Sequence, residues 1–592
     1  MIKQLFLIIL LSSLFTSCTK SFRKEEGKVL NIAVSSGVKG FDPIYGNDRY
    51  ASNEISRVYE TLLEYHYLKR PFQLVPNLAA SMPEVSKDGM TYTFKILKGV
   101  LFHDDAAFKD GKGRELTAED FVYSIKRLAD PKLQGLGWWL IDDKIAGLNE
   151  WREKNKKLSK VNYDEKIEGL SALDRYTIRF KLSKPFPQFL YSLAMSFTSA
   201  VSREVVEHYG RSFINHPVGT GPFRIKDGHY KQTKRIEYYK NPTYRKKLYP
   251  CDGSAELIEK GLTKDCGKRL PLVDRIVVQI TQESQPRWLN FERGRFDYIE
   301  IPKDNFDAVI PDAKTLSPEM SSRGVSLQVV PSLDITYNAF NHDMELFQNK
   351  YLRQAMSLAY NITEVNTLFF NDRGIPAQSV VPPGLKGYDK SFKNPYRGTG
   401  LKSDIEEAKA LLVKAGYPEG KGLSEITYNI ASTTAARQMG EYFKKCMKKI
   451  GIEIKVIQNP WPEFQEKIIR RKIMMFGMAW SADYPDAENF LQLYYGPNKS
   501  PGANGSGYNN AFFNDLFVKA SRMQDTPERT ASYKKLNEYV AEEMPVIFGL
   551  HRQTFVLTHK WLENFIQSDF EQGNAKYYNI NLEQKEEILG NE

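Results

Sequence analysis

The sequence predicts an α/β fold for most of its 592 residues. Segments with the alternation of strands and segments with the 3.6-residue period of helices follow one another along the whole chain. The composition is that of a globular protein, with 41% hydrophobic, 26% charged and 12% aromatic residues. No repeat of about 20–50 residues is visible, which argues against a solenoid. At roughly 100–200 residues per domain, the chain is long enough for about three to five compact units.

Strands are expected where short apolar or alternating runs end at turn residues. The run at 29–35 (VLNIAVS) is followed by Gly37 and Gly40, and the run at 91–97 (TYTFKIL) alternates. Further strands are expected at 175–182, 275–280, 452–457 and 474–480. Because helical patterns separate most of these runs, we expect helices that cover mostly parallel sheets.

Helices are expected where apolar residues recur at helical spacing. Thr117, with Asp120 three residues later, marks the start of a helix that continues over 121–128. Gly416 marks the end of a helix over 404–415. Further helices are expected at 52–65, 185–195, 351–360, 514–521 and 529–543.

The net charge of +11 does not by itself indicate a partner. Lysine and arginine are spread along the chain and interspersed with acidic residues, and no compact basic motif with the context of base recognition is present. We therefore expect no binding to nucleic acid.

The N-terminus has the pattern of an export signal. Lys3 precedes an apolar run at 5–15, and the small residues Thr16 and Ser17 precede Cys18. Eleven apolar residues are too few to span a bilayer core, which needs about 20. Cleavage directly before a cysteine resembles a bacterial lipoprotein signal, so residues 1–17 are expected to be a signal peptide and Cys18 the lipid anchor. A plain secretory peptide with an incidental cysteine is the alternative.

Three further cysteines would enter an oxidising compartment after export. Cys251 and Cys266 lie 15 positions apart in a polar stretch, and we expect them to form a disulfide. Cys446 lies in a helical pattern with apolar neighbours on one face, which indicates a buried thiol. No histidine accompanies these cysteines at zinc-ligand spacing, and no metal site is expected.

A series of motifs then follows in a familiar order. They are FDP at 41–43, VYETLLEY at 58–65, PNLA at 76–79, KDGMTYTFKILKGVLFHD at 87–104, LTAEDFVYSIKRLADP at 116–131, HPVGTGPF at 216–223, NPTY at 241–244, LVDRIVVQI at 272–280, ERGRFDYI at 292–299, YLRQAMSLAYN at 351–361, EEAKALLVKAGYPEG at 406–420 and WSADYPDAENFL at 480–491. With these motifs, nearly all of the chain after Gly27 resembles the extracellular solute-binding proteins of oligopeptide and dipeptide importers, family 5.

The resemblance implies a two-lobed periplasmic-binding-protein fold, class II-like, with an extra subdomain in the first lobe. Lobe I would comprise 27–333 plus 555–592, with the subdomain at about 70–211, and lobe II would comprise 334–554. The segment 245–269 is longer than the family normally has there, so its cysteine pair is expected to be a local feature of this chain.

The resemblance also implies a function. The protein would bind peptides between its lobes and deliver them to an ABC permease, whose ATPase is a separate chain. It would be a monomer in the periplasm or cell envelope, held to a membrane by its lipid, and it would need no cofactor. Catalysis is not expected, because the chain has no HExxH, no G-x-S-x-G and no P-loop motif.

Five residues are implied to contact the ligand. Asp483, which follows Trp480 in the family's Trp-x-x-Asp pattern, would pair with the peptide α-ammonium. Trp461 would line a side-chain pocket, and Trp480, Tyr484 and Asn47 would shape the cleft. Some oligopeptide binders carry an arginine six residues before the aspartate, where this chain has Gly477. The ligand carboxylate is therefore left without an expected partner.

Other readings of the sequence remain. The same fold could bind a non-peptide solute such as a metal chelate, haem or a sugar. A protein of a different class, an envelope hydrolase or a peptide-binding chaperone, is the second alternative. An importer component is distinguished from these by tight binding of peptides with a free α-amino group and by the absence of cleavage.

Overall fold

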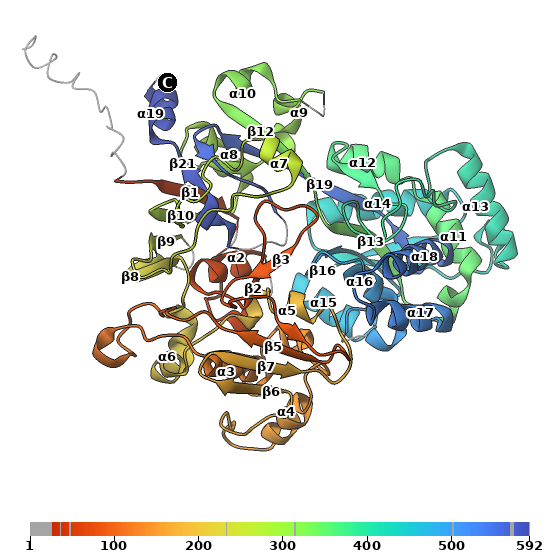
Figure 1. Cartoon of the computed structure of the whole chain (residues 1–592). Helices are drawn as coiled ribbons and strands as arrows, with labels where there is room; N and C mark the ends of the chain where they lie inside the picture. The colour runs from red at the N-terminus through yellow and green to blue at the C-terminus, as the bar shows by residue number, and fades with distance from the viewer. Residues whose placement is uncertain are drawn as a thin grey trace, which may run out of the picture.

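A computed structural model gives the structure of residues 26–590, apart from 36, 47–48, 232–233, 313–314, 500–501 and 569–572. The side chains of residues 49, 227–228 and 461–462 are also outside this description. The chain forms two lobes that lie side by side, with the N-terminal half and the C-terminal end in one lobe and the remainder in the other (Figure 1). We use the residue ranges predicted above as working labels for the two lobes.

The first lobe contains a four-stranded mixed sheet in the order β1-β10-β9-β8. Its strands are β1 (Val29–Val34), β8 (Phe223–Lys231), β9 (Arg235–Lys240) and β10 (Arg275–Ile280). β1 and β10 pair in parallel, while β9 pairs antiparallel with both of its neighbours. The helix α2 (Arg49–Val58) packs against β8.

A second sheet of the first lobe forms the subdomain at the bottom of Figure 1. Its order is β4-β5-β7-β6, and every pair is antiparallel. The strands are β4 (Glu84–Val85), β5 (Thr91–Lys95), β6 (Leu170–Asp174) and β7 (Thr177–Lys181). The helix α3 (Ala118–Ala129) packs on β6 and β7. Thr117 and Asp120 form the capping box at its start, as the sequence predicts.

The second lobe has one five-stranded sheet, in the order β16-β15-β17-β13-β18. Its strands are β13 (Asp334–Phe340), β15 (Ile426–Ala431), β16 (Ile454–Asn459), β17 (Met475–Ser481) and β18 (Val546–Phe548). Helices surround this sheet (Figure 1): α11 (Lys350–Ala359), α12 (Ile362–Phe370), α13 (Lys402–Lys414), α14 (Thr434–Lys448), α15 (Trp461–Ile469), α16 (Glu488–Leu491), α17 (Ala511–Ser521) and α18 (Pro527–Glu543).

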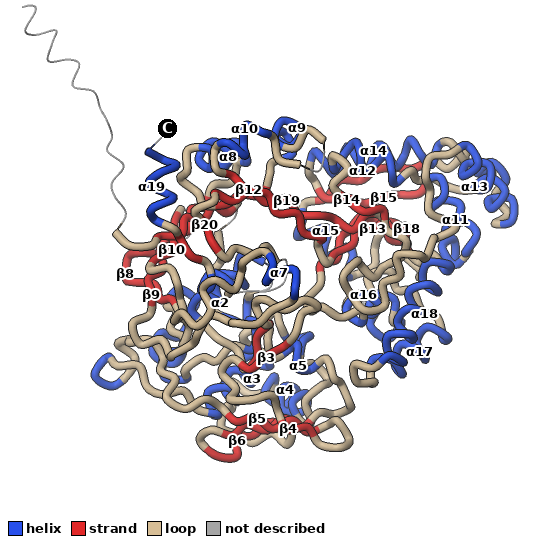
Figure 2. The backbone as a smooth tube through the Cα atoms, turned by 45° about the horizontal axis from the view of Figure 1, so that its top comes forward, coloured by secondary structure: helices blue, strands red, loops and turns tan. Residues whose placement is uncertain are grey.

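Two strand connections join the lobes. β12 (Val325–Pro331) leads into β13, and β19 (Leu550–His559) leads back from β18 to pair antiparallel with β12 (Figure 2). Asp334 at the start of β13 accepts hydrogen bonds from the backbone N–H (2.9 Å) and the Nε (2.5 Å) of Arg552. The remaining elements are β2 (Leu63–Tyr65), β3 (Leu74–Pro76), β11 (Tyr298–Glu300), β14 (Gly374–Pro376), β20 (Leu562–Glu563), β21 (Asn579–Ile580), α4 (Leu148–Lys156), α5 (Phe189–Ser192), α6 (Arg203–Tyr209), α7 (Ala255–Glu259), α8 (Ser284–Glu292), α9 (Phe306–Val309), α10 (Pro318–Ser322) and α19 (Leu582–Gly590).

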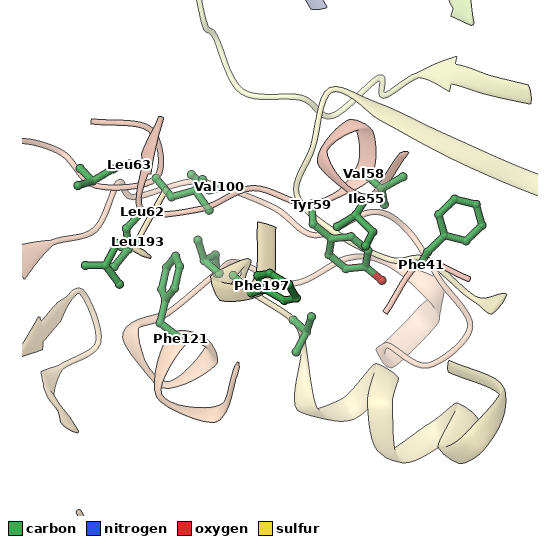
Figure 3. Close-up of a cluster of buried hydrophobic side chains, with 14 of the residues drawn as sticks. Phe41, Ile55, Val58, Tyr59, Leu62, Leu63, Val100, Phe121, Leu193 and Phe197 are labelled. Atoms are coloured by element: carbon green, nitrogen blue, oxygen red, sulfur yellow. The ribbon is translucent and has the colours of Figure 1, made fainter. Parts of the chain in front are cut away.

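The largest apolar core lies in the first lobe and joins its main sheet to its subdomain. Figure 3 shows part of it, where Leu62 lies near Leu193 and Phe121, and Val58 and Tyr59 lie near Ile55. These side chains are at most 2% exposed. Since close-packed interiors hold their side chains in fixed positions, the segment 58–63 is a rigid support for its polar neighbours Glu60, Thr61 and Glu64.

Several expectations need correction. The prediction of mostly parallel sheets is wrong. In the described part of the chain, parallel pairing joins β1 to β10 and β15 to both β16 and β17, and the other strand pairs are antiparallel. Short connections such as that between β6 and β7 force antiparallel pairing, which the alternation of patterns does not reveal. The helix expected at 52–65 ends at Val58, and that expected at 185–195 is limited to α5. The apolar residues at 62–63 are buried in and beside a short strand instead.

Cys251 and Cys266 form a disulfide with a Cα–Cα distance of 4.6 Å. Cys446 is a free thiol buried in α14. Among the helices of the described residues, none combines the length and the apolarity that a bilayer crossing requires. Residues 1–17 and Cys18 lie outside the described residues.

Candidate functional site

A cavity lies where the two lobes meet. The first lobe contributes side chains from 56–65, from 194–199 and from 573–577, together with Asn77 and Pro222. Asp483 is the lining residue from the second lobe. The lining is rich in polar and charged groups, so the cavity suits a polar solute with charges of its own.

Asp483 is held in place by its own loop. It follows the end of β17, two residues after Ser481, where the N–H of Ala482 donates to the carbonyl of Leu333 (2.8 Å). The side chain of Asn489 then bridges the loop: its Nδ2 donates to Asp483 Oδ2 (3.0 Å), and its Oδ1 accepts from the Asp483 N–H (3.1 Å). The same Oδ1 accepts from Trp480 Nε1 (3.0 Å). One amide thus fixes both the carboxylate and the indole.

The Asp483 carboxylate is poorly compensated. No cationic side chain of the described residues forms an ion pair with it, and its hydrogen-bond donor is the neutral amide of Asn489. Burial raises the pKa of Asp483 to about 6, against smaller opposing effects of the Asn489 hydrogen bond and the charge of Lys144. A cationic group in the cavity would relieve the cost of keeping this carboxylate ionised.

Aromatic and polar contacts cross between the lobes beside the cavity. The ring of Tyr191, in α5 of the first lobe, stacks on that of Tyr484 with 5.3 Å between centroids and 5° between planes. Gln188 Nε2 donates to the hydroxyl of Tyr533 (3.4 Å), and Tyr484 donates to Glu488 (2.5 Å). Burial raises the pKa of Glu488 to about 7, and the approach of Lys144 from the first lobe opposes this rise. The second lobe therefore meets the first through buried, polar side chains.

The first-lobe wall of the cavity contains a buried ionic network. Glu60 accepts from Arg245 Nη1 at both oxygens (2.6 Å each). Glu64 accepts from Lys576 (2.6 Å) and from Lys247, which also donates to Asn77 Oδ1 (2.8 Å). Burial disfavours ionisation of Glu64, but the charges of Lys247 and Lys576 outweigh it and lower its pKa to about 2. Both carboxylates are thus ionised and paired.

The structure brings three of the predicted ligand residues together. Asp483 lines the cavity, while Trp480, near the end of β17, and Tyr484, in the loop that follows, lie close to Asp483 without lining the cavity. Asn47 and the side chain of Trp461 lie outside the described residues. The contacts of all five predicted residues with a ligand stay predictions.

Gly477, which stands where some oligopeptide binders have an arginine, lies in β17 opposite Asn338. A Cβ at this position would come within 2.5 Å of the Tyr428 hydroxyl, which donates to Asn338 Oδ1 (2.6 Å). The close approach of this hydroxyl accounts for the glycine. A carboxylate partner for the ligand has to come from elsewhere.

Several residues of this site were missed by the sequence analysis. Asn489 lies inside the motif at 480–491, six positions after Asp483, and this spacing is the signal that was available. Tyr191, Arg245, Lys247 and Lys576 carry no local pattern, because their contacts join segments far apart in sequence. Groups of three or more His, Cys, Asp or Glu placed to hold a metal ion are absent from the described part of the chain.

Comparisons with known proteins agree with this architecture. The family model described as bacterial extracellular solute-binding proteins, family 5 Middle, matches residues 73–502. The chain is 27% identical to heme-binding protein A of Haemophilus influenzae over 92% of this chain and 91% of that protein. It is 24% identical to the dipeptide-binding protein of Escherichia coli, over 94% and 95% of the two chains.

A solved structure with the same fold is the periplasmic binding protein DppA of Helicobacter pylori, in complex with the peptide STSA. It superposes with a TM-score of 0.72 at 24% identity and covers 94% of this chain and 98% of its own. The family match extends over well more than half of the sequence, and the two-lobed fold is shared. The chain therefore belongs to the bacterial extracellular solute-binding proteins of family 5.

Proposed function

We propose that this protein is the peptide-binding component of an ABC importer and that Asp483 pairs with the α-ammonium of its ligand. The observation that carries the proposal is the buried Asp483 carboxylate in the cavity between the lobes, which has an amide but no cation as its partner in the described chain. A charge-assisted hydrogen bond from an ammonium group would compensate it where the local dielectric is low.

The named relatives support this ligand class. One curated relative is a dipeptide-binding protein, and one solved neighbour holds a tetrapeptide. All peptides share a free α-amino group, so a site that recognises this group accepts many sequences. The haem-binding relative keeps a non-peptide solute as a competing candidate, and the experiment below separates the two.

The rest of the proposal concerns the setting of the protein. We propose that it is a non-catalytic monomer, exported by residues 1–17 and anchored through an acylated Cys18. The ligand would stabilise closure of the two lobes, and the permease would recognise the closed form. The lipoprotein pattern at 3–18 and membership of a solute-binding family support this setting.

Calorimetric titration with free and N-acetylated trialanine tests the role of Asp483. For the wild type, we expect acetylation to weaken binding by at least 50-fold. Asp483→Asn should weaken binding of the free peptide by a similar factor, and acetylation should then have little further effect. Asp525→Asn is the matched control, since this exposed carboxylate of the second lobe pairs with Lys386 away from the cavity.

Two results would overturn the proposal. Equal affinity of the wild type for free and acetylated peptides would remove Asp483 from ligand recognition. Saturable binding of haem, with no binding of alanine peptides of two to five residues, would show that the fold serves a different solute.

A further inference from the structure

The first-lobe wall of the cavity, which Asp483 of the second lobe also lines, holds more positive than negative charge. Arg245, Lys247 and Lys576 form a network with the carboxylates of Glu60 and Glu64, and we call these five residues the cationic cluster. All five are more than four-fifths buried at the side chain. With every group in its usual ionisation state, the cluster carries one positive charge in excess.

The negative groups of this cluster are already paired with cations of the chain itself. Glu60 accepts from Arg245 at both oxygens and also from the hydroxyls of Tyr244 (3.0 Å) and Thr220 (3.1 Å). Glu64 receives one lysine on each oxygen. The charge of each carboxylate is therefore already compensated within the chain, although both carboxylates lie at the cavity.

Lys576 is the cation of this cluster that lines the cavity. Within the described chain, its ammonium donates one hydrogen bond, to Glu64 Oε2, and lies 5.1 Å from the centre of the Tyr577 ring. An ammonium group has three N–H donors, so two remain for a partner in the cavity. Lys247 and Arg245 stand behind Glu64, Glu60 and Asn77, with their donors directed to these residues.

An excess charge in such a place is costly. A buried charge without a partner loses its hydration, and attraction to an opposite charge is strong where water is excluded. Burial lowers the pKa of Lys247 to about 7, and the positive charges of Lys576 and Arg245 lower it further. The negative charge of Glu64 opposes this change but does not outweigh it. An anion beside Lys576 would compensate the excess charge of the whole cluster.

We propose that Lys576, backed by Lys247 and Arg245, binds the α-carboxylate of the peptide whose α-ammonium pairs with Asp483. The cavity then has a negative pole on the second lobe and a positive pole on the first, which matches the zwitterion of a short peptide with free ends. This inference rests on the proposed function and deepens it, since it assigns the carboxylate partner that Gly477 does not supply.

The subsite is built from segments that are distant in sequence. Arg245 and Lys247 begin the segment 245–269, which the disulfide Cys251–Cys266 closes, and Lys576 comes from the C-terminal segment. The backbone of Lys247 accepts from the N–H of Leu270, which anchors the segment at its base. The proposed carboxylate subsite therefore depends on the segment 245–269.

The test measures the affinities of alanine peptides of two to five residues, each with a free C-terminal carboxylate (the acid) and with a C-terminal amide. For the wild type, we expect amidation of the best-bound length to weaken binding by at least tenfold. Lys576→Gln should weaken the acid by at least tenfold and the amide by less than twofold. Lys126→Gln is the matched control, because Lys126 is a buried lysine of the first lobe that donates to the carbonyls of Tyr163 and Glu165.

The comparison of acid with amide in the wild type needs no variant, so it stands even if Lys576→Gln fails to fold. Equal affinities for acid and amide, with N-acetylation still harmful, would overturn the carboxylate subsite and leave the proposed function intact. Absence of binding for the whole peptide series would overturn both. A C-terminally amidated peptide that ends in aspartate tests whether the subsite binds the α-carboxylate or a side-chain carboxylate. If this peptide binds the wild type as tightly as the peptide acid does, and Lys576→Gln loses this binding, the subsite binds an acidic side chain and the α-carboxylate assignment is overturned.

Discussion

Tyr191 and Tyr484 stack face to face across the two lobes, with ring centroids 5.3 Å apart and planes within 5°. The first ring belongs to α5 and the second lies next to Asp483, so the contact joins α5 of one lobe to the loop of Asp483 in the other. Aromatic pairs contribute about 0.5–1.5 kcal/mol beyond the area that they bury. The contact is made in the arrangement of lobes seen here and would be lost if they moved apart.

Replacing Tyr191 should therefore weaken ligand binding, although Tyr191 does not line the cavity. For Tyr191→Ala we expect a loss of affinity for peptide of about 2- to 12-fold, which corresponds to the stacking energy given above. Tyr191→Phe keeps the ring and should bind as the wild type does. Titration calorimetry measures both affinities, and small-angle scattering of the unliganded variants reports whether the lobes are further apart. Unchanged affinity of the alanine variant would mean that the stack does not favour closure.

Peptide affinity should fall in acid because of Asp483. Its pKa of about 6 means that the carboxylate is largely ionised at pH 7.5 and largely protonated at pH 5. A neutral carboxyl group cannot form the ion pair, so affinity should drop by roughly fivefold between pH 6 and pH 5, and by roughly tenfold between pH 7.5 and pH 5. Glu488 and Lys144 also titrate near neutrality, with pKa values of about 7 and about 8. The comparison with Asp483→Asn isolates the aspartate: the extra decline below pH 6 should be absent in the variant.

The same residue should reduce the stability of the unliganded protein. Because the folded-state pKa of Asp483 is raised from 3.8 to about 6, the folded chain binds this proton more tightly than the unfolded chain. Stability from this group is therefore lost as the pH rises from about 4 to about 6, and the loss is complete above that range. Asp483→Asn should stabilise the protein by roughly 3 kcal/mol at pH 7.5 and by much less at pH 4. Calorimetry at both pH values checks this, and a lower melting temperature of the variant at pH 7.5 would contradict it.

The disulfide should stabilise the segment that carries Arg245 and Lys247. Closing a loop of about 15 residues contributes roughly 3 kcal/mol on the chain-entropy estimate. The double variant Cys251→Ser/Cys266→Ser should therefore melt at a lower temperature than the wild type, and a reducing agent should lower the melting temperature of the wild type but not of the variant. Thiol titration of the denatured protein without residues 1–25 should give one thiol before reduction and three after. Three thiols before reduction would show that the bridge does not form.

The sequence allowed the local features of this molecule to be predicted. Thr117 and Asp120 cap α3, and the last helical residue of α13 lies two positions before Gly416, because caps are encoded within a few residues. Asp483 was found because it belongs to a short motif. The predicted direction of strand pairing was wrong, because the residue pattern of a strand is the same whether its neighbour runs parallel or antiparallel to it.

The cationic cluster at the cavity could not be predicted from the sequence, for a different reason. Lys576 lies 512 positions from Glu64, and Lys247 lies 183 positions from it. Each lysine alone resembles any surface lysine in a chain with 83 basic residues. Only the fold brings them to one buried carboxylate.

Native mass spectrometry of the purified protein tests the central claim most directly. The protein would be produced without its signal and with Cys18 replaced, so that it is not acylated, and then analysed intact and after denaturation. The account predicts a set of short peptides with free ends, clustered in length, that leave the protein when it unfolds and are absent from Asp483→Asn. A single non-peptide species, such as haem or another metal complex, would contradict it.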